Sequence, residues 1–237
     1  MHSTKSNLRV LYEDNHLIVI NKRIGDIVQG DITGDKPLSE VVKEYIAEKY
    51  DKPGKTFLGV VHRLDRPTTG VVVFAKTSKA LERLNKMLRD KTIEKIYWAL
   101  VEGHPESDSG TLVHYLRKNP KNNKATAFTK ESADTKKAVL HYRELLSLDR
   151  YTLLEINLET GRHHQIRCQL SVTGYPIKGD LKYGSKRSNK DGGIHLHAAR
   201  IKFMHPVKKE EITIEAPLPK EVLWQLCSDL LQSKRGS

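Results

Sequence analysis

The sequence has few cysteines and no long apolar run. Its 237 residues include only Cys168 and Cys227, which lie far apart and form no Cys-x-x-Cys pair. Neither a disulfide framework nor a cysteine zinc site is therefore expected. The longest apolar runs, such as residues 71–75, fall far short of the roughly 20 residues that span a bilayer. The first seven residues are polar and do not resemble a signal peptide. We expect a protein of the reducing cytoplasm with no membrane partner.

Nucleotide-binding fingerprints and metal-ligand clusters are also missing. There is no Gly-x-x-x-x-Gly-Lys phosphate loop and no Gly-x-Gly-x-x-Gly after a predicted strand, so no ATP or NAD cofactor is expected. Among the eleven histidines, the adjacent His163 and His164 should point in different directions. His195 and His197 share a strand face but lack an evident acidic third ligand. We therefore predict no metal site.

Basic side chains are what the sequence has in excess. It contains 41 Lys and Arg against 29 Asp and Glu, a formal charge of +12. The run 117–137 has seven basic side chains against two acidic ones, and the run 178–190 has five against one. Either run alone fits a solvated lysine-rich surface equally well. Two runs on a chain with this net charge favour RNA or DNA as the partner.

Hydrophobic periodicity predicts an α+β fold with a mixed, mainly antiparallel β-sheet and flanking helices and loops. Hairpins and irregular loops join the predicted strands, which argues against a doubly wound parallel sheet. The predicted strands cover residues 8–12, 17–20, 71–76, 94–102, 137–143, 152–158, 196–203 and 211–215. Helices are expected from caps at Ser39 and Ser78. A last helix over about 220–232 would place Leu223, Leu226, Cys227 and Leu230 on one face. The simplest architecture is one domain over residues 1–237, with a core of about 8–217.

The segment from Val60 to Ala75 is the most informative part of the chain. Asp65 lies between Arg63 and Arg66, in a turn marked by Pro67 and Gly70 and directly before an apolar strand. Flanking guanidinium groups favour the charged form of a carboxylate. The string alone does not distinguish a catalytic carboxylate from a loop salt bridge.

The run His62-Arg63-Leu64-Asp65, followed by a hydroxyl-rich turn and a glycine, resembles the signature around the catalytic aspartate of the RluA-type RNA pseudouridine synthases. Four more stretches resemble family segments in the same order. They are the tyrosine strand 95–103, the Thr-Gly-Arg-x-His-Gln-Ile-Arg segment within 159–167, the stretch 174–180, and 196–198. Five ordered matches make the resemblance highly specific.

This resemblance implies that the chain isomerises a uridine in transfer or ribosomal RNA, without a metal or cofactor. The base is detached at its glycosidic nitrogen, rotated, and rejoined through C5. Asp65 corresponds to the catalytic aspartate, which acts at the ribose as a nucleophile or by taking a sugar proton. Arg167 corresponds to the basic residue that pairs with this aspartate, although a phosphate contact is the alternative for a lone arginine.

Tyr97 corresponds to the active-site tyrosine, whose ring can stack on uracil and whose phenol can assist removal of the C5 proton. From the residues alone, Tyr97 shares a strand face with Ala99 and Val101, so core packing is the alternative. Arg63 corresponds to a position associated with insertion beside the extruded nucleotide. A plain salt bridge to Asp65 is the alternative for Arg63.

The remaining RNA-binding predictions rest on the basic runs and on the family segments. His164 would orient its loop or contact RNA. A departure from the family occurs at Arg23, where many members have proline. Only about seven residues precede the first predicted strand, so RNA recognition should come from the catalytic domain itself, acting as a monomer. The expected RNA contacts are Arg63, His62, Arg162, His164, Lys121, Lys124 and Lys182.

Three functions are weighed. A pseudouridine synthase is preferred. A catalytically inactive RNA-binding protein on the same scaffold would have no need for Asp65, Tyr97 and Arg167 as a set. A metal-dependent nuclease would lose its activity to a chelator.

Overall fold

A computed structural model describes residues 2–31, 33–51 and 54–236 of the chain. It divides into two compact units, 1–94 with 198–217, and 95–197 with 218–237. The predicted α+β class and mainly antiparallel pairing are confirmed. A single domain over residues 1–237 stays a prediction. Within the described ranges no helix is long and apolar enough to cross a membrane.

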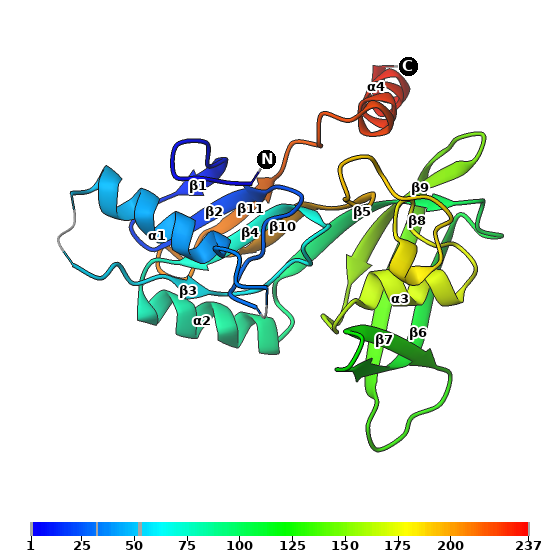
Figure 1. Ribbon diagram of the computed structural model, residues 1–237, viewed down its shortest axis with the longest axis horizontal. Helices are drawn as coiled ribbons and strands as arrows, with labels where there is room; N and C mark the ends of the chain where they lie inside the picture. Colours follow the sequence, from blue (N-terminus) through cyan, green and yellow to red (C-terminus); the bar gives the residue numbers. More distant parts are fainter. Residues whose placement is uncertain (1, 32, 52–53, 237) are drawn as a thin grey trace. The chain divides into compact units, whose positions relative to one another are not determined.

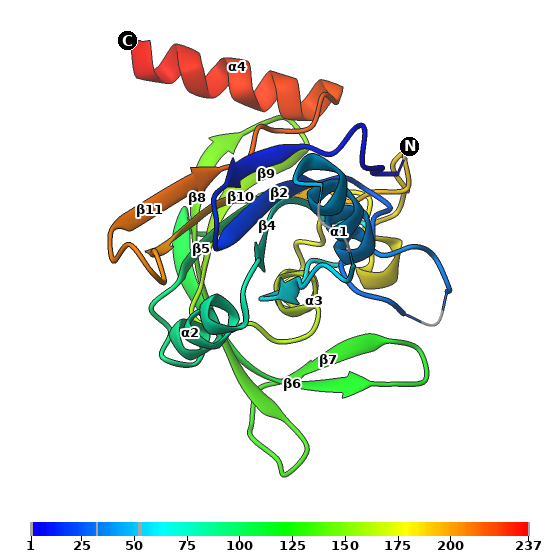
Figure 2. The same ribbon diagram turned by 90° about the vertical axis from the view of Figure 1, so that its left-hand side faces the viewer.

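Unit 1 is a sheet flanked by two helices (Figures 1 and 2). Its strands follow the order β1-β2-β4-β10, with β3 paired to β4 and β11 paired to β10. Both faces of β2 and β4 are buried, and Ala80 and Leu84 of α2 pack against one of them. The elements are β1 (Val10–Glu13), β2 (Leu17–Lys22), α1 (Leu38–Lys49), β3 (Gly59–Val60), β4 (Thr69–Ala75), α2 (Ser78–Arg89), β10 (Leu196–Met204) and β11 (Glu211–Glu215).

Unit 2 is an antiparallel sheet in the order β5-β9-β8-β6-β7. Helix α3 packs on the β6–β7 hairpin, where the Sγ of Cys168 lies 3.4 Å from the carbonyl oxygen of Ala125. Trp224 and Cys227 of α4 pack against Leu100 and Leu153. The elements are β5 (Glu94–Glu102), β6 (Ser109–Asn119), β7 (Lys124–Phe128), β8 (Lys136–Ser147), β9 (Tyr151–Leu158), α3 (Gln165–Val172), the 3₁₀ turn η1 (Leu181–Tyr183) and α4 (Val222–Gly236).

Several sequence predictions of local structure are wrong. Ser39 lies inside α1, which begins after Pro37 without a side-chain cap. Thr77, not Ser78, caps α2, because its side chain accepts a hydrogen bond from the backbone N–H of Ala80. On α4, Leu226 and Leu230 are 42% and 38% exposed, so they do not share the buried face of Cys227.

Candidate active site

Asp65 lies in the turn between β3 and β4. A hydrogen bond within the turn and packing against the sheet of unit 1 fix its backbone. The backbone N–H of Thr68 donates to the carbonyl oxygen of Asp65 at 3.0 Å, which closes the turn. Gly70 follows with φ +111°, and a Cβ there would lie 2.2 Å from the carbonyl oxygen of Ala198 on β10. Only glycine fits this position, because its conformation is left-handed and its contact is with backbone. The half-buried Asp65 therefore stands on a rigid support.

Lys22 is the principal support that the sequence analysis missed. Its side chain is 1% exposed, and β2 register places it opposite Gly70. The Nζ atom donates to the carbonyl oxygens of Arg23 at 2.9 Å, Arg66 at 3.0 Å and Thr68 at 2.7 Å. Three acceptors match the three donors of an ammonium group. Two of them belong to the turn that carries Asp65, so Lys22 holds that turn onto β2.

The electrostatics of Lys22 involve Asp65 directly. Burial lowers the pKa of Lys22 from its ordinary 10.5 to about 7, and the carboxylates of Asp26 and Asp65 act in the opposite direction. The negative charges of these two carboxylates favour the ammonium form of Lys22. Lys22 is thus a cationic neighbour of Asp65 that lies far from it in sequence.

The predicted role of the flanking arginines is different in the structure. Arg66 turns away to the 31–35 loop, where it pairs with Asp35 at 2.7 Å and with Asp31 at 3.8 Å. Arg63 is exposed and forms no hydrogen bond or ion pair with any described residue, so the alternative of a salt bridge to Asp65 is wrong. The Nε2 atom of His62 accepts a hydrogen bond from the backbone N–H of Val73 at 3.2 Å. RNA contacts by Arg63 and His62 stay predictions.

Tyr97 lies on β5 in unit 2, opposite Ile156 of β9, and is 7% exposed. It shares its strand face with the buried Ala99 and Val101, as the alternation predicts. Lys95 lies on the same face, two residues earlier, and forms no hydrogen bond or ion pair with a described residue. Burial lowers the pKa of Lys95. The strand therefore presents an aromatic ring and an ammonium group on one face.

Arg167 lies on α3 and pairs with Asp180. Its Nε and Nη2 atoms donate to the two carboxylate oxygens at 2.6 and 2.9 Å, and the side chains are 6% and 1% exposed. This two-point geometry is specific to a guanidinium and a carboxylate. The pair uses two of the five N–H donors of Arg167. The implied pairing of Arg167 with Asp65 stays a prediction.

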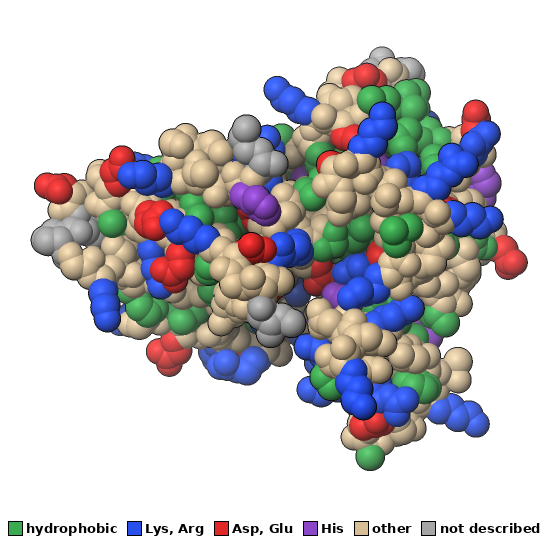
Figure 3. All heavy atoms as spheres, in the orientation of Figure 1, with side chains coloured by type: hydrophobic (Ala, Val, Ile, Leu, Met, Phe, Trp, Pro, Cys, Tyr) green, Lys and Arg blue, Asp and Glu red, His purple; other side chains and the backbone are tan. Residues whose placement is uncertain are grey.

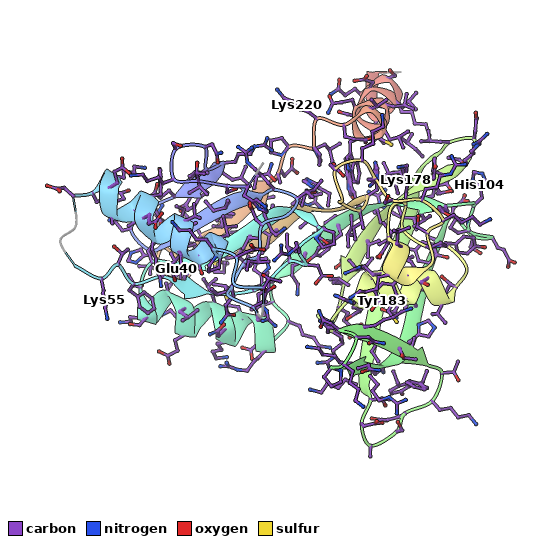
Figure 4. The ribbon with its side chains drawn as sticks, in the orientation of Figure 1. Glu40, Lys55, His104, Lys178, Tyr183 and Lys220 are labelled. Atoms are coloured by element: carbon purple, nitrogen blue, oxygen red, sulfur yellow. The ribbon has the colours of Figure 1, made fainter. Side chains whose placement is uncertain are left out.

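Tyr183, which Figure 4 labels, contacts both Arg167 and the β6–β7 hairpin. Its ring centroid lies 5.0 Å from Cζ of Arg167 and 5.2 Å from Nζ of Lys124. The Tyr183 hydroxyl accepts from the backbone N–H of Ala125 at 2.7 Å and lies 2.9 Å from Nδ1 of His164. Because the hydroxyl accepts from the amide, its own proton is available to His164. Burial raises the pKa of Tyr183, which keeps the phenol protonated.

Side-chain bonds of Gln165 close the loop that leads into α3. Its amide oxygen accepts from the Thr160 hydroxyl at 2.8 Å and from the Arg162 backbone N–H at 2.9 Å. The Nε atom of Arg162 donates to the carbonyl oxygen of Lys137 at 2.9 Å. His164 has φ +52°, and its ring stacks on that of His163 at 3.8 Å. The expectation that these two rings point apart is therefore wrong, because the left-handed backbone at His164 brings them together.

The run 117–137 forms most of the β6–β7 hairpin and its flanks. Lys121 is exposed in the turn and Lys124 begins β7. Basic side chains cluster over this part of the surface (Figure 3). Lys182 from the second run donates to the carbonyl oxygens of Asn122 and Asn123 at 3.2 and 3.3 Å, so it joins the hairpin tip. Arg117, in contrast, is neutralised by Asp134 at 2.9 Å.

The predicted site residues are thus distributed over both units. Asp65, His62 and Arg63 belong to unit 1, and Tyr97 and Arg167 belong to unit 2. Among residues 2–31, 33–51 and 54–236, no group of three or more His, Cys, Asp or Glu side chains is arranged to hold a metal ion. The residues that sequence reasoning missed are Lys22, Lys95, Asp180 and Tyr183. Asp180 lies in one of the family segments, which was the available signal.

The family of the chain follows from its similarity to known proteins. The family model described as RNA pseudouridylate synthase matches residues 16–172. An uncharacterised RNA pseudouridine synthase of Synechocystis is 38% identical over 218 residues, which are 90% of this chain and 66% of that protein. An uncharacterised RNA pseudouridine synthase of Bacillus subtilis is 35% identical over 222 residues, which are 91% of this chain and 71% of that protein. The chain belongs to the RNA pseudouridylate synthase family, so the predicted family is confirmed.

Solved structures agree with the fold. The human RNA pseudouridylate synthase domain containing 4 superposes with a TM-score of 0.77 at 24% identity, covering 94% of this chain and 93% of that one. The human RNA pseudouridylate synthase domain containing 1 gives a TM-score of 0.71 at 21% identity, covering 100% and 98%. Family membership indicates an isomerase that forms pseudouridine in RNA, and no observation favours the inactive alternative.

Proposed function

We propose that this chain converts uridine to pseudouridine in large-subunit ribosomal RNA. A relative from Vibrio parahaemolyticus named ribosomal large subunit pseudouridine synthase C is 33% identical over 90% of this chain, which spans 66% of that protein. A relative from Zymomonas mobilis named ribosomal large subunit pseudouridine synthase D is 32% identical to this chain. These names favour ribosomal over transfer RNA among the two substrates that the sequence predicts.

Asp65, Tyr97 and Arg167 are the proposed catalytic residues. The observation that carries this assignment is that the family match over residues 16–172 includes all three. In the proposed reaction the C1′–N1 bond of uridine breaks, uracil turns, and a bond forms between C1′ and C5. The C5 proton then leaves to a base. N1 gains a proton, so the reaction is an isomerisation.

Asp65 acts at the ribose in its ionised form. As a nucleophile it would form an ester at C1′ that C5 of uracil later displaces, and as a base it would take the C2′ proton and later return it. Either route needs a carboxylate, and Lys22 and Asp65 interact electrostatically at this place. Tyr97 contributes a ring that can stack on uracil and a phenol that can take the C5 proton directly or through water.

Pseudouridine mapping in large-subunit ribosomal RNA and in transfer RNA tests the substrate. RNA from cells without this protein should lack one or more modified positions in large-subunit RNA and regain them when the wild-type chain is supplied. The Asp65→Asn variant should not restore them, while its RNA affinity and melting temperature stay close to wild type. Restoration by Asp65→Asn would contradict the catalytic assignment. A loss confined to transfer RNA would contradict the substrate.

A further inference from the structure

Unit 2 contains a cavity of about 830 Å³ that none of the proposed catalytic residues lines. Its walls come from the 186–191 loop, the start of α4, and the turn between β8 and β9. Figure 4 labels two further lining residues, Lys178 before η1 and Lys220 just before α4. The basic residues in its lining are Arg150, Lys178, Lys186, Arg187, Lys190 and Lys220.

The acidic side chains of the cavity are already engaged. Glu102 accepts from the Ser185 hydroxyl at 2.6 Å, and Asp191 accepts from the backbone N–H of Gly193 at 3.0 Å. Glu221 accepts from Nε2 of His195 at 2.9 Å. Among the described residues, none of these carboxylates forms a hydrogen bond or ion pair with a basic residue of the cavity lining.

Five basic side chains are left without a partner. Each is exposed and forms no hydrogen bond or ion pair with a described residue. Like charges gathered around one cavity repel each other, and an anionic ligand relieves that repulsion. The five are Arg150, Lys186, Arg187, Lys190 and Lys220.

The loop that carries three of these charges is anchored. Asn189 accepts from Nζ of Lys178 at 2.6 Å and donates to the carbonyl oxygen of Gly193 at 3.0 Å. It also lies 2.9 Å from Nδ1 of His195, which stacks on Trp224 of α4. The cationic groups therefore start from a fixed backbone, which reduces the entropy lost when they bind a ligand.

The cavity is separate from the face that carries Tyr97. Glu102 lies five residues beyond Tyr97 on β5, about 17 Å along the strand. Because successive side chains alternate, Glu102 and Tyr97 point to opposite faces of the sheet. A ligand in the cavity is therefore not the nucleotide that Tyr97 would contact.

We propose that this cavity binds phosphodiester groups of the substrate RNA, on a segment outside the modified nucleotide. The proposal rests on the proposed function for its ligand. RNA is favoured over an acidic protein because six of the lining residues are basic and only Tyr151 and Val222 are apolar or aromatic, whereas protein interfaces are built around a group of such residues. Arginine and lysine around a phosphate-sized anion are the usual RNA backbone contacts.

The test compares two double variants that each remove one arginine and one lysine. Arg187→Gln with Lys190→Gln changes the cavity. Lys79→Gln with Arg89→Gln changes exposed and unpartnered charges on α2 of unit 1. Binding to a large-subunit ribosomal RNA transcript is measured against salt concentration, and kcat and KM are measured for pseudouridine formation. The cavity variant should raise Kd and KM about tenfold, leave kcat unchanged, and lower the salt slope by about 1.5 for two lost contacts.

A second pair from the opposite walls, Arg150→Gln with Lys220→Gln, should act in the same direction. The inference is overturned if Kd and the salt slope stay at wild-type values, which would leave the cavity to another anion or an acidic protein. It is also overturned if the α2 control loses as much affinity, since net charge alone would then explain the effect. Absence of turnover in the wild type would contradict the proposed function, while the binding measurements would still decide about the cavity.

Discussion

Asp180 holds Arg167 through both of its carboxylate oxygens, and both side chains are buried. Removing one member of a buried ion pair costs several kcal/mol, so the pair contributes to the stability of unit 2. The ring of Tyr183 packs beside the guanidinium. Helix α3 therefore presents Arg167 in a single orientation, set by residues that come later in the chain.

Replacing Arg167 by lysine should separate charge from geometry. Lysine keeps the positive charge but cannot make the two-point contact with Asp180. We expect Arg167→Lys to lower turnover at least tenfold at saturating RNA and to keep the fold. Asp180→Asn removes one charge of this buried ion pair and should lower the free energy of unfolding by about 3 kcal/mol. Single-turnover kinetics and urea denaturation measure both effects. Wild-type turnover by Arg167→Lys would show that the planar contact has no role in the reaction.

The Tyr97→Phe variant removes one hydroxyl and keeps the ring. Because the ring stays packed on β5, we expect unchanged RNA affinity and stability, and a loss of at least about a hundredfold in tritium release from RNA labelled at C5 of uridine. Tyr45→Phe, on α1, serves as a control that should release tritium at the wild-type rate.

RNA with 5-fluorouridine identifies the step that needs the Tyr97 phenol. Fluorine at C5 blocks the final proton loss, so detachment and rejoining of the base can be followed separately. Tyr97→Phe should still form the rearranged fluorinated product. If it fails on both substrates, the hydroxyl acts before C5 deprotonation and the proposed role is wrong.

Lys22→Met should destabilise unit 1. The substitution removes the ammonium donor from the carbonyl oxygens of Arg23, Arg66 and Thr68, and among the described residues only that of Arg66 keeps a second donor, the backbone N–H of Gly25 at 3.0 Å. We expect a loss of about 3 kcal/mol in the free energy of unfolding. Lys79→Met on the exposed surface of α2 is the matched control and should change it by less than about 0.5 kcal/mol. Equal urea midpoints for the two variants would show that Lys22 does not stabilise the turn that carries Asp65.

The lowered pKa of Glu13 should make the free energy of unfolding fall at acidic pH. Burial would raise its pKa, but hydrogen bonds from Lys49, Lys76 and Tyr50 prevail and lower the pKa from the ordinary 4.5 to about 2. The unfolded chain then binds more protons below pH 4.5, so this stabilisation is present above pH 4.5 and is lost as the pH falls toward 2.

The Glu13→Gln variant should flatten the dependence of unfolding free energy on pH between about 4.5 and 2. Glu82→Gln, an exposed residue of α2 without a partner among the described residues, should leave the curve unchanged. Urea denaturation at half-unit pH steps gives both curves. If the unfolding free energy of Glu13→Gln fell with pH as steeply as that of the wild type, other carboxylates would cause the loss of stability in acid.

Strands that alternate over a buried face were predictable from the sequence. The bounds of β5 and β11 agree with the predicted 94–102 and 211–215. The β6–β7 hairpin was not predicted, because its charged residues resemble a solvated run and its apolar ones are mostly half-exposed. Helix α3 was missed since Gln165, Arg167 and Gln169 are buried in it, against the usual placement of polar residues.

The sequence predicted the site residues that lie in segments resembling the family. It did not predict the residues that hold those side chains in place from distant parts of the chain. Asp65, Tyr97 and Arg167 came from the resemblance. Lys22 lies 43 residues before Asp65, and no local pattern shows that its ammonium meets the carbonyl groups of the Asp65 turn. Long-range hydrogen bonds to backbone carry no sequence signature of their own.

The close packing of Gly70 on Ala198 has a consequence for synthesis of the chain. Unit 1 is assembled from residues 1–94 and 198–217, so the strand that supports the Asp65 turn is translated after most of unit 2. The bond from Asn21 to the carbonyl oxygen of Pro217 and the pair of His205 with Asp14 arrive equally late. Unit 2 has most of its sequence in one stretch and can begin to fold on the ribosome first. The carboxylate proposed to start the reaction therefore has its full support only after β10 is translated, and a nascent chain that stops before β10 lacks the backbone of Ala198 against which Gly70 packs.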